Sequence, residues 1–239
     1  MLLRPPRPKL FEGLSPAALY RLAAWFSPSF PVGAFSYSSG VEWAVEVRDI
    51  TDAATLKQWI RVMLAYGGGF CDAVFFVHVH RAVAADNDRS LCEVAELAAA
   101  FVSSKERYLE TTQQGQAFFE TMRATWPCAA LDHFAKIWDG PIALPTIAGV
   151  ATAGHNIPAE PALHAYLQAM AANLVSAGVR LIPLGQTDGQ RLIVGLENEI
   201  GVTVERALAS VLDEVATSAF RVDLATMHHE TQYTRLFRS

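Results

Sequence analysis

The sequence has few cysteines, and their spacing does not suggest pairing. Cys71, Cys92 and Cys128 are odd in number, lie far apart and form no Cys-x-x-Cys pair. Disulfide-rich secreted domains and structural zinc sites both depend on more cysteines at closer spacing. The sequence therefore favours reduced, buried thiols over a disulfide framework or a zinc site.

Positive charge is also scarce. The chain has 19 Lys and Arg residues against 24 Asp and Glu residues, a net charge of −5 and a pI near 5.8. Because no basic stripe runs along any segment, we expect no nucleic-acid surface. The N-terminus has prolines where a signal peptide needs an apolar core, and no uninterrupted apolar run reaches the roughly 18 residues of a membrane span. We expect residues 1–14 to be a disordered leader of a cytoplasmic protein that contacts no membrane.

Catalytic and cofactor motifs are missing as well. The glycines at 67–69 are not followed by Gly-Lys-Ser/Thr, so they predict a helix break or close helix packing and not a phosphate-binding loop. Ser36 lies outside any Gly-x-Ser-x-Gly elbow. The run from His229 to Tyr233 has Tyr where a zinc-protease helix needs its second His. We expect no enzymatic activity and no tightly bound metal or cofactor.

Helical periodicity is abundant. Ser15 and Pro16 predict a helix start, and apolar stripes with spacings of three and four follow in residues 19–26, 56–64, 91–102, 163–181 and 204–215. Half of the residues are apolar, which is ample for a core, and the mean hydropathy of +0.20 suggests further apolar surface buried against partners. The prediction is an all-α, single-domain bundle of about ten helices over residues 15–226.

Two segments need a choice between structures. Residues 74–83 are apolar enough for a buried strand, but no strand partner exists elsewhere, so we predict a buried helix on which His78 and His80 diverge by about 200°. Residues 105–122 carry Glu106, Arg107, Glu110 and Gln113 at helical spacing. Since charge runs usually face water, we predict a solvated face with local ion pairs there.

Residues 27–42 combine two prolines, two glycines, several serines and three aromatic rings. Pro fixes φ and Gly permits backbone conformations closed to other residues, so this segment predicts an ordered turn. Ser39 is the candidate N-cap of the helix that follows, with Glu42 three residues on as in a capping box. Further along, Arg180 ends a polar line with Asn173 and Ser176. Because a buried Arg needs a carboxylate or carbonyl partner, Arg180 is either a structural clasp or part of a contact patch.

Three separated segments resemble the urease accessory protein UreF family: residues 22–42, residues 179–190 and residues 229–239. They occur in the family's order and in a chain of its length. This sequence has Ser39 where the family often has His, Val41 where Leu is common, and His228 where Arg is usual. The first difference weakens any proposal of a metal ligand in the N-terminal segment.

The resemblance implies a non-catalytic scaffold for nickel insertion into apo-urease. Members of the family form homodimers, join UreD (UreH in some species) and recruit the GTPase UreG, whose GTP cycle they are proposed to modulate. Nickel would then be handled by the complex and not bound tightly by this chain. The resemblance suggests two contact sets. The turn and the tail, residues 227–239, would meet UreD or UreH through Phe35, Tyr37, Glu230, Thr231, Gln232, Tyr233, Arg235, Leu236, Phe237 and Arg238. The dimer-side surface seen by UreG would comprise Arg180, Gln186, Thr187, Asp188 and Gln190.

The tail has its own expectations. Tyr233 and Phe237 are four residues apart and would share a face if helical, and rings beside guanidinium groups are typical of binding hot spots. We therefore expect the tail to order against a partner. Two other functions stay open: a small helical hydrolase using Ser36 or Tyr37 with His155 or His229, and a direct nickel carrier using His78, His80, His228 and His229.

Overall fold

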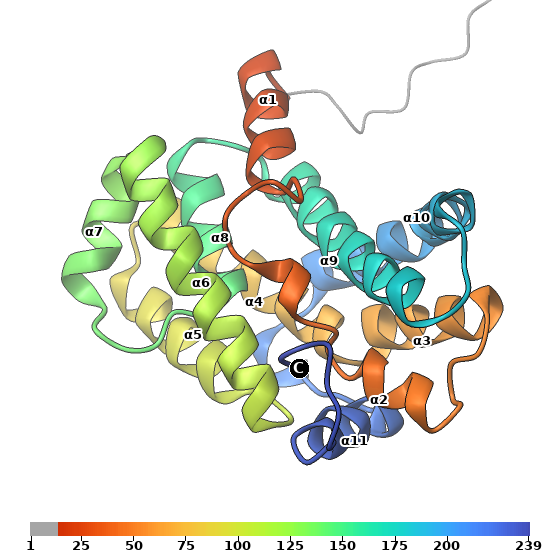
Figure 1. Ribbon diagram of the computed structural model, residues 1–239. Helices are drawn as coiled ribbons and strands as arrows, with labels where there is room; N and C mark the ends of the chain where they lie inside the picture. The colour runs from red at the N-terminus through yellow and green to blue at the C-terminus, as the bar shows by residue number, and fades with distance from the viewer. Residues whose placement is uncertain (1–13) are drawn as a thin grey trace, which may run out of the picture.

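The computed structural model describes residues 14–239, so nearly all of the expected leader lies outside the described residues. Within that range the chain forms one all-helical bundle without strands, which confirms the predicted fold class (Figure 1). Its helices are α1 (Pro16–Trp25), η2 (Ala34–Ser36), α2 (Val41–Glu46), α3 (Ala53–Tyr66), α4 (Gly68–Ala84), α5 (Asp88–Ala100), α6 (Lys105–Thr125), α7 (Ala129–Ile137), α8 (Leu144–Gly154), α9 (Ala159–Leu181), α10 (Gln186–Ala209), η3 (Leu212–Glu214) and α11 (Phe220–His229).

Helix α4 lies at the centre of the bundle (Figure 1). It packs against α3, α5, α8, α9 and α10, and its Phe75, Phe76 and Val79 side chains are almost fully buried. A helix that is apolar all round is stable only when other helices surround it. The prediction of a buried helix at residues 74–83 is therefore confirmed.

The glycines at 67–69 separate α3 from α4. Gly67 is extended and serves both as the C-cap of α3 and as the N-cap of α4. A Cβ on Gly69 would lie 2.9 Å from the main-chain oxygen of Met63, so the backbones approach closely there. The predicted helix break is confirmed.

The segment Ala53–Ala84, which joins α3 and α4, is long and apolar enough to cross a membrane by length and composition alone. Its most apolar 18-residue window has a mean hydropathy of 1.5. A count of uninterrupted apolar residues does not detect this segment, because polar residues are interspersed in it. However, 67% of that window is buried inside the bundle, as expected of core helices. The core role of α4 explains the hydropathy without a membrane.

The polar face of α6 is turned inward. Glu106 and Glu110 are only 6% and 5% exposed and Arg107 is half-buried, so the predicted solvated face is wrong for these residues, and only Gln113 of the predicted set is exposed. The charged groups of this face contact α11, the turn after α1 and the C-terminal tail. They therefore make long-range bonds in addition to the predicted local ion pairs. This buried polar region positions the candidate site.

Candidate functional site

The turn between α1 and α2 is ordered by two left-handed glycines. Gly33, with φ of 73°, precedes η2, and Gly40, with φ of 82°, precedes α2. A Cβ on Gly40 would also lie 2.9 Å from the main-chain nitrogen of Thr226, so the turn lies directly against α11. The predicted ordered turn is confirmed.

Ser39 does not cap α2, which corrects the predicted capping box. The N-cap is Gly40, and the Glu42 main-chain N–H donates to the Ser38 hydroxyl at 3.3 Å. The backbone of Ser39 is left-handed, with φ of 51°, and its hydroxyl donates to Glu110 at 2.9 Å. Since Glu110 comes from α6, a pattern confined to residues 38–42 could not reveal this bond.

The C-terminal tail runs back along the turn, and the chain end lies between α6 and α2 (Figure 1). The Arg238 main-chain N–H donates to the Ser36 oxygen at 2.8 Å, and the Ser38 N–H donates to the Ser239 oxygen at 2.8 Å. The expectation that the tail needs a partner to become ordered is therefore incomplete, because the tail is already ordered against its own chain.

Glu42 anchors the tail through main-chain bonds. One of its oxygens accepts from the Leu236 N–H at 2.6 Å and the other from the Phe237 N–H at 2.9 Å. Glu42 is only 7% exposed. A buried carboxylate needs such donors, and these bonds join α2 to a segment almost 200 positions later.

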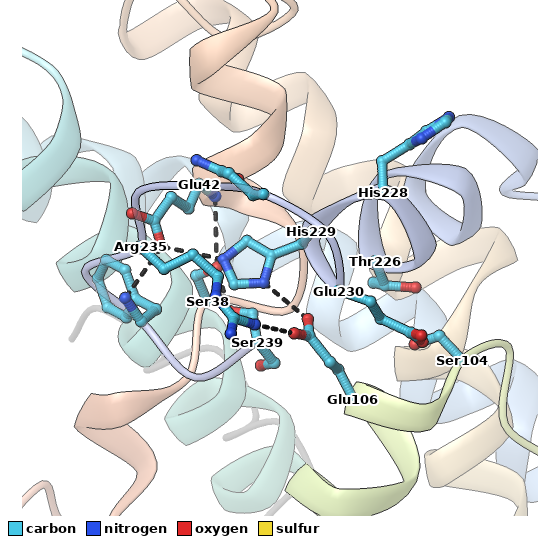
Figure 2. Close-up of polar contacts among 12 residues, drawn as sticks. Ser38, Glu42, Ser104, Glu106, Thr226, His228, His229, Glu230, Arg235 and Ser239 are labelled. Carbon is cyan, nitrogen blue, oxygen red and sulfur yellow. Dashed lines mark hydrogen bonds and ion pairs between the residues drawn. The ribbon is translucent and has the colours of Figure 1, made fainter.

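His229 lies at the centre of the buried polar network, as Figure 2 shows. Its Nδ1 is 2.7 Å from Glu106 and its Nε2 is 3.0 Å from Glu42, while the side chain is fully buried. A neutral imidazole has one N–H group and can donate to only one acid. Hydrogen bonds from both ring nitrogens to two carboxylates therefore need one additional proton, either on the ring or on one of the acids. Arg235 adds a donor to Glu106 at 2.9 Å. We name Glu42, Glu106, His229 and Arg235 the tail clasp.

The tail clasp also shifts the titration of Glu106. Burial raises the pKa of this carboxyl group, while the hydrogen bond from His229 and the charges of His229 and Arg235 oppose the rise. The net direction is upward, toward the neutral acid. Burial and paired charge thus compete in the clasp, and its members depend on one another.

A second buried ion pair lies next to the clasp. Arg107 is 2.9 Å from Glu110 and 3.8 Å from Asp72, and the Tyr166 hydroxyl donates to Asp72 at 3.0 Å. Burial raises the pKa of Asp72 to about 6, although Arg107 and Tyr166 act in the opposite direction. Burial opposes the charge of Arg107, but Glu110 and Asp72 hold its pKa above the usual value.

Arg180 joins the turn to the tail. Its guanidinium group donates to the Phe35 main-chain oxygen at 3.0 Å and lies over the Phe237 ring, 4.3 Å from the centroid. The sequence left two roles open for Arg180, and the observed contacts are those of a structural role that joins the turn to the tail. Arg180 remains exposed, so these contacts leave it accessible from outside.

Three predicted contact residues of the turn and the tail have exposed side chains. Phe35 is 69% exposed, Leu236 is 65% exposed and Tyr233 is fully exposed. We name Phe35, Arg180, Tyr233, Leu236 and Arg238 the loop–tail face. Because α11 ends at His229, the tail is not helical, and the condition for Tyr233 and Phe237 to share a helix face is not met.

Other predicted contact residues support the tail internally. Phe237 and Tyr37 are each 4% exposed, and the Tyr37 hydroxyl donates to Gln113 at 2.5 Å. Glu230 accepts from the Lys105 N–H at 2.9 Å, at the N-terminus of α6. These groups hold the tail in place and are not offered to a partner in this conformation.

Two of the predicted tail residues make only local bonds. The Thr231 hydroxyl donates to the His228 main-chain oxygen at 3.3 Å, and the Gln232 amide donates to the Thr234 oxygen at 3.1 Å. Such bonds shape the turn after α11 without reaching another element. A role for either residue in a partner contact stays a prediction.

The second predicted contact set lies at the start of α10. Gln186, Thr187 and Gln190 are exposed, and Asp188 accepts from the Gly185 N–H at 3.3 Å as the helix begins. The contacts of Arg180 go to the turn and the tail and not to these side chains. The structure thus places Arg180 with the first set.

The histidines of the nickel-carrier hypothesis point to different partners. His78 bonds to the Ser210 oxygen at 3.1 Å, and His80 bonds to the Ile157 oxygen at 2.8 Å. His228 stacks on Trp43, apart from the clasp (Figure 2). Within residues 14–239, no three His, Cys, Asp or Glu side chains form a group that could hold a metal ion.

The hydrolase hypothesis also lacks its central contact. His155 bonds to the Trp126 main-chain oxygen at 3.0 Å, and no hydrogen bond joins it to Ser36 in the described part of the chain. His229 is held by the two carboxylates of the tail clasp. Nucleophilic catalysis needs a base within hydrogen-bond reach of the hydroxyl.

Comparison with known proteins decides the family. The UreF family model matches residues 50–197. The urease accessory protein UreF of Bradyrhizobium sp. (strain ORS 278) is 53% identical over 232 residues, covering 97% of this chain and 96% of the relative. The UreF of Bradyrhizobium diazoefficiens is 55% identical, covering 93% and 92%. The UreF of Rhodopseudomonas palustris (strain BisB18) is 54% identical, also covering 93% and 92%.

The chain belongs to the UreF family. This confirms the resemblance found in the three sequence segments. The family match begins at residue 50, so the turn at 27–42 and the tail lie outside the matched range, while the whole-chain relatives cover nearly all residues. UreF membership supports a role in urease maturation.

Proposed function

We propose that this UreF-family chain is a non-catalytic cytoplasmic scaffold that binds UreD (or UreH) and the GTPase UreG and brings them to apo-urease for nickel insertion. The relatives are named urease accessory proteins, which supports the maturation role. Nickel is in this view the cargo of the assembly. The chain acts as a homodimer, and modulation of the GTP cycle of UreG belongs to the same proposal.

The observation that carries the proposal is the loop–tail face. It combines two exposed apolar side chains, a fully exposed aromatic ring and two guanidinium groups, and main-chain hydrogen bonds hold the tail against the turn. Aromatic and Arg side chains dominate protein–protein hot spots. The tail clasp fixes the conformation of the tail, which reduces the conformational entropy that is lost when a partner binds.

We assign UreD or UreH to the loop–tail face and UreG to the start of α10. Gln186, Thr187 and Gln190 offer an exposed polar surface without the large rings of the first face. The two surfaces are thus chemically different, as two different partners require. Arg180 belongs with the first face because its guanidinium group contacts Phe35 and Phe237.

The structure also sharpens the test. Truncation before His229 would remove a fully buried residue and its two carboxylate contacts, so a lost complex could reflect a damaged fold. Substitutions on the exposed surface avoid this problem. We choose Phe35→Asp with Leu236→Asp for the first face and Gln186→Ala with Gln190→Ala for the second.

The experiment co-expresses each variant with UreD or UreH and with UreG and measures complex mass by size exclusion with light scattering. We expect the first double variant to lose UreD or UreH and the second to keep that partner but lose UreG. Val202→Asp, an exposed apolar position on α10, is the matched control and should leave both complexes intact. If the intact chain binds neither partner, the proposal fails.

A further inference from the structure

A cavity of about 260 Å³ lies between the turn and helices α4, α6 and α9. Its walls are largely apolar and aromatic, with Trp25, Phe26, Met63, Phe118, Met170 and Leu174 among them. Asp72, Arg107 and Glu110 form a polar end. The volume is just below the roughly 300–1,000 Å³ typical of small-molecule sites, so any ligand must be small.

The polar end carries one negative charge in excess, because Asp72 and Glu110 face a single Arg107. The two acids differ in how fully they are bonded. Glu110 accepts from the hydroxyls of Ser39 and Ser239 and pairs with Arg107 at 2.9 Å. Its oxygens are therefore occupied, which leaves Asp72 as the acid that can receive a ligand.

Asp72 has a free acceptor. Its Oδ2 accepts from the Tyr166 hydroxyl at 3.0 Å and is 3.8 Å from Arg107, beyond hydrogen-bond distance. Its Oδ1 accepts no hydrogen bond from any residue between 14 and 239. A poorly solvated carboxylate with an open acceptor attracts a charged N–H donor.

Gln114 points independently to a ligand. It lines the same cavity from α6 and is 6% exposed, yet its amide makes no hydrogen bond to the described residues. The amide atoms of Gln114 are not among the fully buried atoms that lack a partner, so the unbonded amide is open to the cavity. The amide offers two donors and one acceptor oxygen to a polar group inside the cavity.

We propose that this cavity is a binding site for a small organic cation, with an amine or guanidine nitrogen against Asp72 and an apolar or aromatic body against the apolar walls of the cavity. Aromatic walls stabilise organic cations through their ring faces, whereas a hydrated metal ion would lose its water ligands against them. Gln114 would bind a polar substituent on the same molecule. The site is a property of the isolated chain and does not rest on the scaffold function.

The test compares three probes of similar size by calorimetric titration of the full chain at neutral pH: 2-phenylethylamine, 2-phenylethanol and 3-phenylpropionate. The ammonium probe should bind saturably and at least tenfold more tightly than the alcohol, a difference of about 1.4 kcal/mol. The anionic probe should not bind. Equal affinities for the three probes, or no saturation by the amine, would overturn the proposal.

Variants locate the site. Asp72→Asn keeps the side-chain shape and an acceptor for Tyr166, and it should reduce amine affinity about tenfold while leaving the alcohol unchanged. Ala169→Leu fills the cavity and should weaken both probes without changing its charge. Asp223→Asn, an acid lining the neighbouring cavity of about 210 Å³, is the matched control and should change amine affinity less than twofold. Wild-type amine affinity in both Asp72→Asn and Ala169→Leu would sink the assignment.

Discussion

The guanidinium group of Arg180 lies over the ring of Phe237, with its central carbon 4.3 Å from the ring centroid. The same group donates to the main-chain oxygen of Phe35. One side chain from the end of α9 thus holds the turn and the tail together. This arrangement adds to the main-chain hydrogen bonds that hold two segments about 200 positions apart side by side.

We predict that Arg180→Ala loosens the tail without unfolding the bundle. The change removes a cation–π contact and a hydrogen bond to a carbonyl, together about 1–2 kcal/mol. Hydrogen exchange of the Phe237 amide should become roughly tenfold faster, because that amide is protected only while the tail is seated on Glu42. Arg191→Ala, an exposed Arg paired with Asp188, should leave the exchange unchanged. Equal exchange in Arg180→Ala and the wild type would show that Arg180 does not hold the tail.

We predict a larger effect for His229→Gln. The change removes the ring that joins two buried carboxylates, so the free energy of unfolding should fall by about 3 kcal/mol in denaturant titration. Trypsin should also cut the native variant at Arg235, whose pairing with Glu106 depends on the intact clasp.

The adjacent histidine is the control for that variant. His228→Gln removes an exposed ring stacked on Trp43 and should cost less than 1 kcal/mol, roughly the value of such a contact. Similar losses in the two variants would contradict the central place of His229.

Local sequence patterns predicted α1, the buried α4 and the break at residues 67–69 because each depends on neighbouring residues. They failed for Ser39 and for the polar face of α6. The decisive partners of those side chains lie far away in the sequence, as in the bond from Ser39 to Glu110 and the bond between Glu106 and His229. The family motifs located the turn and the tail, but only the fold shows that Tyr37 and Phe237 are buried and that Arg180 belongs with them.

Cysteine reactivity tests the packing near the second cavity. Burial and the nearby Asp72 and Asp223 carboxylates raise the pKa of the Cys71 thiol to about 12, whereas Cys128 is half-buried. Since the thiolate is the reactive form, Cys71 should react with iodoacetamide at pH 8 on the order of a thousandfold more slowly than an ordinary thiol. Peptide mass spectrometry of the native protein should find Cys128 modified first. Comparable labelling of both would contradict this packing.

The pH dependence of stability should show the cost of ionising Asp72. Its pKa is raised to about 6 from 3.8, so between these values the folded chain binds more protons than the unfolded chain. The free energy of unfolding therefore falls as pH rises through that window, and the destabilisation by the ionised Asp72 is fully present above pH 6. Asp72→Asn removes the ionisation and should raise the free energy of unfolding by roughly 2–3 kcal/mol at pH 8 but little at pH 4.

Asp132→Asn provides the comparison for this pH series. Asp132 forms an exposed pair with Arg123, and such surface pairs contribute roughly 0–1 kcal/mol. Its denaturation midpoints should follow those of the wild type from pH 4 to pH 8, the range chosen to span the titration of Asp72. If Asp72→Asn also follows the wild type throughout, the pKa of Asp72 is not shifted by folding, and the pairing with Arg107 and Tyr166 fully offsets burial.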